Sequence, residues 1–369
     1  MTDNADVLSK RVERAQQLME ASGYDLLVIG PSADFRYLTG HSPHLSERLT
    51  ALILPWNGKG TIVVPRLEAP LIKDLTDRFD LAVWDETDNP LERVAELARQ
   101  TRSESVGIND QLWSGFLLRL QKALPNATYE PGNAVLSKLR ASKDDAELEV
   151  LREASRRTDA AWEEFCTTQR LTGRTEREVA DSLCAIMAKH GMPEIAFCIV
   201  GSGPNGASPH HHLSDRVIQP GDPVVMDFGG ILDGYYSDIT RTPVAGEPHP
   251  DFVEIYNVVL EAQQAAFDAI KPGVACQDVD RAARKVITDH GYAEYFIHRL
   301  GHGIGLTAHE DPYLVEGNTE LMQVGNVFSD EPGIYIPDRW GVRIEDSVAV
   351  TETGAERLNQ VSRALTSLP

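Results

Sequence analysis

Cysteine is scarce in this chain, and long apolar runs are absent from it. The four cysteines among its 369 residues are scattered and form no C-x-x-C pair, which argues against a structural zinc site and a disulfide framework. We expect them to be small buried thiols. No apolar run approaches the roughly 20 residues that cross a bilayer. The charged segment 1–20 has the spacing of an amphipathic helix rather than of a signal peptide, so we expect a cytoplasmic protein.

Basic residues are few relative to acidic ones. The chain has 35 lysines and arginines against 56 aspartates and glutamates, a net charge of −21. This charge disfavours nucleic acid and membrane surfaces as partners. There is also no G-x-S-x-G elbow, Walker loop or kinase signature. The one G-x-G-x-x-G match, at 201–206, contains Pro204 and precedes Pro209, so it indicates a tight turn and not a dinucleotide loop.

The length exceeds that of one ordinary core and predicts two domains, at 1–135 and 140–369. The first alternates strand and helix patterns, which is typical of an α/β domain. A charged helical pattern at 138–157 opens the second. In the first domain we expect strands at 25–29, 52–55, 61–64 and 81–84 and helices at 68–76 and 90–102.

The second domain shows a weak internal duplication. Helical patterns at 172–191 and 272–291 each begin near a glycine and end at His-Gly, at an offset of one hundred residues. Further along, 219–224 resembles 323–328, and in that register Asp227 lies opposite Glu331. A duplicated fold would bring the acids of its two halves together at a pseudo-twofold axis.

Four acids and one histidine in this domain form a candidate metal site. The acids follow apolar, β-prone runs, where a charge is costly unless something pairs with it. Two divalent cations would pair with all of them and would form hydrolytic machinery. Oxygen-rich ligation with one imidazole favours Mn²⁺ or Co²⁺, with Zn²⁺ or Fe²⁺ as alternatives, over copper. The five residues are Asp227, Asp238, His302, Glu331 and Glu345.

The other histidines divide into two groups. His210 and His309 lie in loops beside the proposed metal ligands, where a donor to the transition state is useful. Four more histidines are expected to be structural. Of these, His190 and His249 are expected to end helices, where a histidine interacts favourably with the helix dipole. The four are His190, His249, His290 and His298.

Taken together, these residues resemble the "pita-bread" metallopeptidases, which include Xaa-Pro dipeptidase (prolidase), Xaa-Pro aminopeptidase and methionine aminopeptidase. The resemblance covers nearly the whole chain and implies an α/β creatinase-like N-terminal domain followed by an α+β pita-bread domain with a pseudo-twofold duplication. Segment 34–40 resembles a part of the N-terminal domain in the proline-specific branch. The signature segments are 227–229, 237–242, 301–306, 309–310, 331–335 and 343–346.

The resemblance also implies roles for the metal-site residues. Asp227 would chelate one metal, and His302 and Glu331 the other. Asp238 and Glu345 would bridge the two. Glu331 would also carry a proton during catalysis.

Three further residues would act on the substrate. His210 and His309 match family histidines that contact the substrate and stabilise the tetrahedral intermediate, and Arg343 resembles an arginine near the bridging carboxylate. Two positions depart from the family pattern. Asp330 stands where an apolar or small residue is more common, and His211 stands where a glycine often follows the histidine.

The implied reaction is hydrolysis of the Xaa-Pro bond, a tertiary amide without an N–H that ordinary peptidases handle poorly. The expected substrates are small peptides with proline second, and the expected enzyme is a dipeptidase. An aminopeptidase acting on longer peptides is the alternative. A creatinase-like C–N hydrolase and a non-catalytic binding protein are disfavoured, because those relatives lack the metal set. We expect a homodimer. The loop 41–48, with His41, His44, Glu47 and Arg48, would either read the proline carboxylate or be a solvated loop.

Overall fold

The computed structural model describes residues 5–369 and divides into two compact units, Met1–Arg140 and Ala141–Pro369. The expected N-terminal helix is α1 (Ala5–Ser22); positions 1–4 of that expectation lie outside the described residues. None of the helices within 5–369 is long and apolar enough to cross a membrane.

Unit 1 is built on a six-stranded sheet with the order β4-β3-β2-β1-β5-β6. β1 pairs antiparallel with β2 and parallel with β5, so the sheet is mixed. The four expected strands are present, but the expected helix at 68–76 is the 3₁₀ helix η1. The elements after α1 are β1 (Leu26–Ile29), α2 (Ala33–Thr39), β2 (Ala51–Pro55), β3 (Thr61–Pro65), η1 (Ala69–Leu75), β4 (Asp80–Trp84), α3 (Pro90–Gln100), β5 (Ser105–Ile108), α4 (Ser114–Ala123) and β6 (Thr128–Pro131).

The single helix expected at 138–157 is two helices, α5 (Asn133–Ala141) and α6 (Asp145–Thr168). Asp144 causes the break, because its side chain accepts the backbone N–H of Glu147 while the Glu147 side chain accepts that of Asp144. This capping box satisfies two N–H groups that a helix start leaves unpaired, so a new helix begins there.

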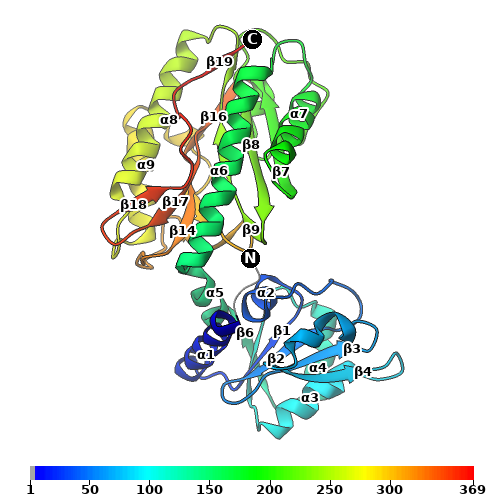
Figure 1. The fold of residues 1–369 in the computed structure, drawn as a ribbon. Helices are drawn as coiled ribbons and strands as arrows, with labels where there is room; N and C mark the ends of the chain where they lie inside the picture. The colour runs from blue at the N-terminus through cyan, green and yellow to red at the C-terminus, as the bar shows by residue number, and fades with distance from the viewer. Residues whose placement is uncertain (1–4) are drawn as a thin grey trace. The chain divides into compact units, whose positions relative to one another are not determined.

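Unit 2 has two principal sheets, with orders β10-β8-β7 and β13-β12-β14-β17-β18, and the helices α6 to α9 pack around them (Figure 1). Two small sheets, β15-β16 and β11-β19, complete it. The helices after α6 are α7 (Glu176–Lys189), η2 (Gly203–Ala207), α8 (Pro250–Ala269), α9 (Cys276–Asp289) and η3 (Ala293–Tyr295). The strands are β7 (Glu194–Ser202), β8 (Val224–Leu232), β9 (Tyr235–Tyr236), β10 (Ile239–Arg241), β11 (Val244–Ala245), β12 (Gly301–Gly303), β13 (Glu310–Leu314), β14 (Val327–Asp330), β15 (Gly333–Ile336), β16 (Trp340–Arg343), β17 (Asp346–Val350), β18 (Ala355–Arg357) and β19 (Ser367–Leu368).

The expected duplication is visible in the helices and in the contacts that precede them. α7 and α9 both have 14 residues and begin one hundred positions apart. An isolated antiparallel bridge precedes each helix, Thr175 with Val217 and Ala275 with Leu321. The two halves therefore repeat one supersecondary unit, as the pita-bread fold requires.

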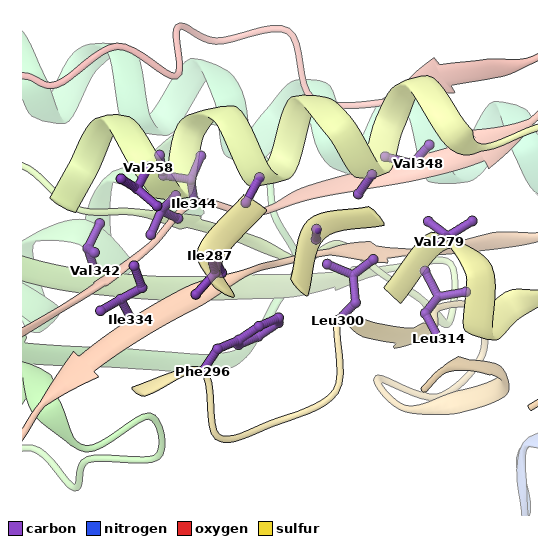
Figure 2. Close-up of a cluster of buried hydrophobic side chains, with 14 of the residues drawn as sticks. Val258, Val279, Ile287, Phe296, Leu300, Leu314, Ile334, Val342, Ile344 and Val348 are labelled. Atoms are coloured by element: carbon purple, nitrogen blue, oxygen red, sulfur yellow. The ribbon is translucent and has the colours of Figure 1, made fainter. Parts of the chain in front are cut away.

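The second half of unit 2 buries a continuous apolar core between α8, α9 and the strands beneath them. Figure 2 shows Val258 of α8 and Ile287 of α9 near Ile334 and Val342 from the strands, with Val348 at the other end of the same cluster. All five side chains are at most 4% exposed. This packing fixes the strands that carry His302 or flank Glu331 and Glu345.

Candidate functional site

One cavity of about 620 Å³ in unit 2 is lined by all eight of the site residues named from the sequence. They are Asp227, Asp238, His302, Glu331, Glu345, His210, His309 and Arg343. The rest of its wall comprises Phe197, Ile199, Ser208, Pro209, Ile297, His298, Arg299 and Ala308. The cavity thus combines a polar, acidic part with a partly apolar wall, which is the usual character of a ligand site.

The acids reach the cavity from the line where the two principal sheets meet. Asp227 lies in the middle of β8, directly opposite Thr240 of β10. Thr240 also forms an isolated antiparallel bridge with Glu345, and its hydroxyl donates to the Glu345 carboxylate at 2.6 Å. Asp238 stands immediately before β10. A short stretch of backbone therefore places acids from both halves side by side.

His302 enters the site on β12, between two glycines that allow neighbouring strands to approach closely. A Cβ atom on Gly301 would lie 1.9 Å from the carbonyl oxygen of Ser329, and one on Gly303 would lie 2.4 Å from that of Asp311. Neither contact is possible for a larger residue without moving backbone, which explains the Gly-His-Gly pattern.

The imidazole of His302 is oriented so that one nitrogen faces the acids of the cavity. Its Nδ1 lies 3.2 Å from the Gly303 carbonyl oxygen, which suits a proton on Nδ1. Its Nε2 faces the Glu331 carboxylate at 3.3 Å and the Asp238 carboxylate at 3.9 Å. Ligand atoms of Asp238, His302 and Glu345 all lie within 4.8 Å of one another.

The electrostatics of these acids fit divalent cations. Burial raises the pKa of Asp227, against the charge of Arg343. Burial, and next a neighbouring acid, raise the pKa of Asp238 and Glu345 well above their usual range. Burial also acts to raise the pKa of Glu331, but the hydrogen bond and charge of His302 outweigh it and lower that pKa to about 2. Asp227 Oδ1 is buried and has no hydrogen-bond partner among residues 5–369. Crowded carboxylates with unused oxygens are stabilised when a cation binds them.

Arg343 connects the acids of the cavity to Tyr335 and, through Tyr335, to His298. Its guanidinium donates to Asp227 Oδ2 at 2.6 Å, to the Thr240 hydroxyl at 3.0 Å and to the Tyr335 hydroxyl at 2.9 Å. Tyr335 is in turn 3.0 Å from His298 Nε2. Burial raises the pKa of Tyr335 to about 12 and lowers that of His298, so we expect both to be neutral at pH 7.

The two loop histidines lie at the cavity with different surroundings. The ring of His309 is 3.8 Å from that of His302, centroid to centroid, and its Nδ1 is 3.4 Å from Arg299 Nη2. Burial, with the positive charges of His302 and Arg299, lowers the pKa of His309 to about 4. His210 is exposed in the loop after η2. His309 is therefore a neutral imidazole at pH 7.

The four histidines expected to be structural have mixed outcomes. His190 ends α7, as expected, and hydrogen-bonds Glu164 at 2.9 Å. His249 does not end a helix: it caps the start of α8, so that expectation is wrong. His290 ends α9. His298 lines the cavity, a place that the sequence interpretation did not give it; its position four residues before His302 was the available signal.

Tyr335 was part of a signature segment but had no expected role, and the structure brings it to Arg343 and His298. Asp330, a departure from the family pattern, is buried at the end of β14, and neither carboxylate oxygen has a hydrogen-bond partner within 5–369. Burial raises its pKa well above the usual range, which favours an uncharged side chain. Asp330 therefore does not need a cation to be tolerated there.

The loop 41–48 belongs to unit 1. Arg48 donates to Glu47 at 2.5 Å and to Glu86 at 2.7 Å. Burial lowers the pKa of His41. The role of the loop 41–48 in recognising the substrate stays a prediction.

Comparison with known proteins agrees with this geometry. Residues 149–352 match the family described as "Metallopeptidase family M24", and residues 11–142 match "Creatinase/Prolidase N-terminal domain".

The similarity to individual relatives extends over the full chain. The chain is 42% identical to a "Probable dipeptidase PepE" of Mycobacterium tuberculosis, over 99% of this chain and 98% of that protein. It is 34% identical to a "Xaa-Pro dipeptidase" of Pyrococcus horikoshii, over 98% and 99%. The crystal structure of dipeptidase PepE from Mycobacterium ulcerans has a TM-score of 0.95 at 42% identity, covering 100% of both chains.

This family uses divalent metal ions, and the buried carboxylate and histidine cluster has the donor set to hold them. The chain is thus a peptidase: it belongs to metallopeptidase family M24 and carries a creatinase/prolidase N-terminal domain.

Proposed function

We propose that the protein is a dinuclear-metal-dependent Xaa-Pro dipeptidase. One observation carries the proposal: four carboxylates that are at most 14% exposed, one imidazole whose Nε2 faces them and two further histidines share one cavity. A creatinase-like hydrolase or a binding protein would not need the complete acid set. Full-length relatives named Xaa-Pro dipeptidase support the choice of substrate.

In this proposal Asp227 would hold one metal, His302 and Glu331 would hold the other, and Asp238 and Glu345 would be shared between them. The metals would supply an activated water and polarise the scissile carbonyl. Mn²⁺ or Co²⁺ fits the oxygen-rich donor set best, with Zn²⁺ or Fe²⁺ as alternatives. Metal analysis of protein purified without added metal would identify the ion that it retains.

The chain's own groups would do the remaining work. His309, which is neutral at pH 7, and His210 would donate hydrogen bonds to the oxygen that becomes negative in the transition state. Glu331, ionised at neutral pH, accepts a proton and passes it to the proline nitrogen as the bond breaks. Arg343 holds Asp227 in place through its 2.6 Å contact.

Substrate length separates a dipeptidase from the alternative Xaa-Pro aminopeptidase. Kinetics with Ala-Pro and Ala-Pro-Pro in the presence of Mn²⁺ should give a much higher kcat/KM for the dipeptide. Cleavage of the tripeptide with similar efficiency would favour the aminopeptidase, and cleavage of neither would reject both. The homodimer and the cytoplasmic location stay predictions; sedimentation analysis of the purified protein tests the first.

A further inference from the structure

Glu176 is a fully buried acid that the proposed reaction does not use. It is the first residue of α7, directly after the N-cap Thr175, and its side chain is 0% exposed. A buried carboxylate is tolerated only when hydrogen bonds replace its lost hydration. Its partners therefore show what it does.

Both oxygens of the Glu176 carboxylate are saturated by donors. Oε1 accepts from the N–H and hydroxyl of Ser202, both at 2.8 Å, and from the Asn205 amide at 2.9 Å. Oε2 accepts from the N–H of Ser214 at 3.3 Å and its hydroxyl at 2.6 Å, and lies 2.8 Å from His211 Nε2. Burial acts to raise the pKa of Glu176, but these hydrogen bonds outweigh it and lower the pKa.

These donors bracket the segment that forms one wall of the cavity. Ser202 stands at its beginning and Ser214 at its end, and the residues that line the cavity, Ser208, Pro209 and His210, lie between them. His211 is the direct neighbour of His210. Glu176 thus binds both ends of a loop and the residue next to its functional histidine.

The carboxylate is not needed to start the helix. In the duplicated half, α9 begins with Cys276 at the equivalent place. The backbone N–H groups of Glu176 and Cys276 make corresponding bonds, to the carbonyl oxygens of Arg216 at 3.1 Å and Glu320 at 2.9 Å. This backbone bond is therefore made with and without an acid, although α7 has a Thr175–Glu178 capping box and α9 has no side-chain cap. The side chain of Glu176 is an addition found only in the half that carries His210.

We infer that Glu176 is a positioning residue, which holds His210 at the cavity through His211 and Ser214. The inference rests on the proposed function, because His210 is a substrate-contacting residue only there. It also gives a role to His211, which stands where the resembled family often has glycine: a glycine could not reach Glu176.

The test uses two variants and one matched control in the full-length, metal-loaded protein. Glu176→Gln keeps the side chain's shape, but its NH₂ group faces donors and cannot accept from them. His211→Ala removes one donor at a side chain that is 16% exposed, so it guards against a folding failure of the first variant. His212→Ala is the control, since His212 is the next residue and is exposed.

Two measurements are made on each protein. The first is kcat and KM for Ala-Pro, both in the wild-type background and in a His210→Ala background. The second is amide hydrogen exchange of residues 203–214 by mass spectrometry. The exchange measurement does not depend on activity. If the wild type hydrolyses no Xaa-Pro peptide, the proposed function fails while the effect of Glu176 on the loop is still measured.

We expect Glu176→Gln and His211→Ala to lower kcat by between about tenfold and 100-fold, since small misplacements of catalytic groups cost that much. KM should change less, and exchange of 203–214 should rise. In the His210→Ala background the same substitutions should have little further effect. Unchanged exchange, or equal losses of kcat in both backgrounds, would overturn the inference. His212→Ala should match the wild type throughout.

Discussion

At the level of the residue, the buried carboxylate of Asp238 is expected to be essential for metal-dependent turnover. It is 5% exposed, and its ligand atom lies within 4.8 Å of those of His302 and Glu345, which come from the other half of unit 2. We predict that Asp238→Ala abolishes metal-dependent turnover, a loss of roughly three orders of magnitude or more, because metal assistance supplies several kcal/mol of transition-state stabilisation. His249→Ala, at the start of α8, should leave turnover intact. Near-normal kcat in the first variant would refute the site assignment.

A second prediction at this scale concerns Glu310, next to His309. Its carboxylate pairs with Lys143 at 2.8 Å, and the two side chains are 3% and 1% exposed. Glu310→Ala leaves a buried ammonium without this partner, which costs about 3–5 kcal/mol. Urea unfolding should report that loss. The exposed pair of Arg281 and Glu316 provides the comparison: Glu316→Ala should leave the unfolding midpoint nearly unchanged.

At the level of the element, α9 acts on the cavity wall through Asp280. This fully buried acid accepts the backbone N–H of Leu300 at 2.9 Å and two bonds from Arg284, at 2.9 and 3.0 Å. Arg284 also donates to the carbonyl oxygens of Phe296 and His298, at 3.0 and 2.8 Å. The pair therefore holds the segment that leads into His302.

We predict that Asp280→Ala lowers kcat/KM for Ala-Pro by about tenfold, through displacement of His298 and His302. It should also lower the free energy of unfolding by about 3 kcal/mol, since Arg284 loses its buried partner. Asp278→Ala is the matched control, because Asp278 lies on the same helix with a side chain that is 52% exposed. Equal effects of the two substitutions on kcat/KM would contradict the prediction.

The elements also show what a sequence can and cannot predict. The eight site residues could be named from the sequence for two reasons. Polar and charged side chains beside apolar strands are destabilising unless they share a site with partners, and these residues stand in motif segments. His298 and Asp280 could not be named, because their roles depend on contacts between segments whose relative placement no local pattern encodes. The sequence pattern did not predict the break between α5 and α6. Asp144 stands in a highly charged run, where an N-cap aspartate cannot be distinguished from the other acids.

The duplicated unit as a whole is symmetric in its backbone and asymmetric in its chemistry. Asp227 and Glu331 occupy equivalent places on β8 and after β14, yet only Glu331 has a histidine at 3.3 Å. Asp227 instead has Arg343 at 2.6 Å. Burial raises the pKa of Asp227 despite the opposing charge of Arg343, whereas burial of Glu331 is outweighed by His302, which lowers its pKa. The two metal positions should therefore differ in affinity, and titration with Mn²⁺ should show two distinct binding steps.

The raised carboxyl pKa values predict how metal and pH act together on the stability of the whole protein. In metal-free protein, Asp227, Asp238 and Glu345 retain protons that the unfolded chain has released, so their contribution to stability falls as pH rises above their ordinary pKa values. Glu331 acts oppositely, but its contribution is lost only as pH falls below about 4.5 towards its folded pKa of about 2.

A divalent cation displaces the retained protons, so metal binding tightens with rising pH. We predict that the difference in Tm between Mn²⁺-loaded and chelator-treated protein is larger at pH 8 than at pH 5.5. At a hundredfold excess of free metal over Kd, the gain in unfolding free energy is about 2.7 kcal/mol. Asp238→Asn should reduce both the gain and its pH dependence, because an amide has no proton to displace. A metal-induced shift in Tm that is the same at both pH values would show that these carboxyls are not the ligands.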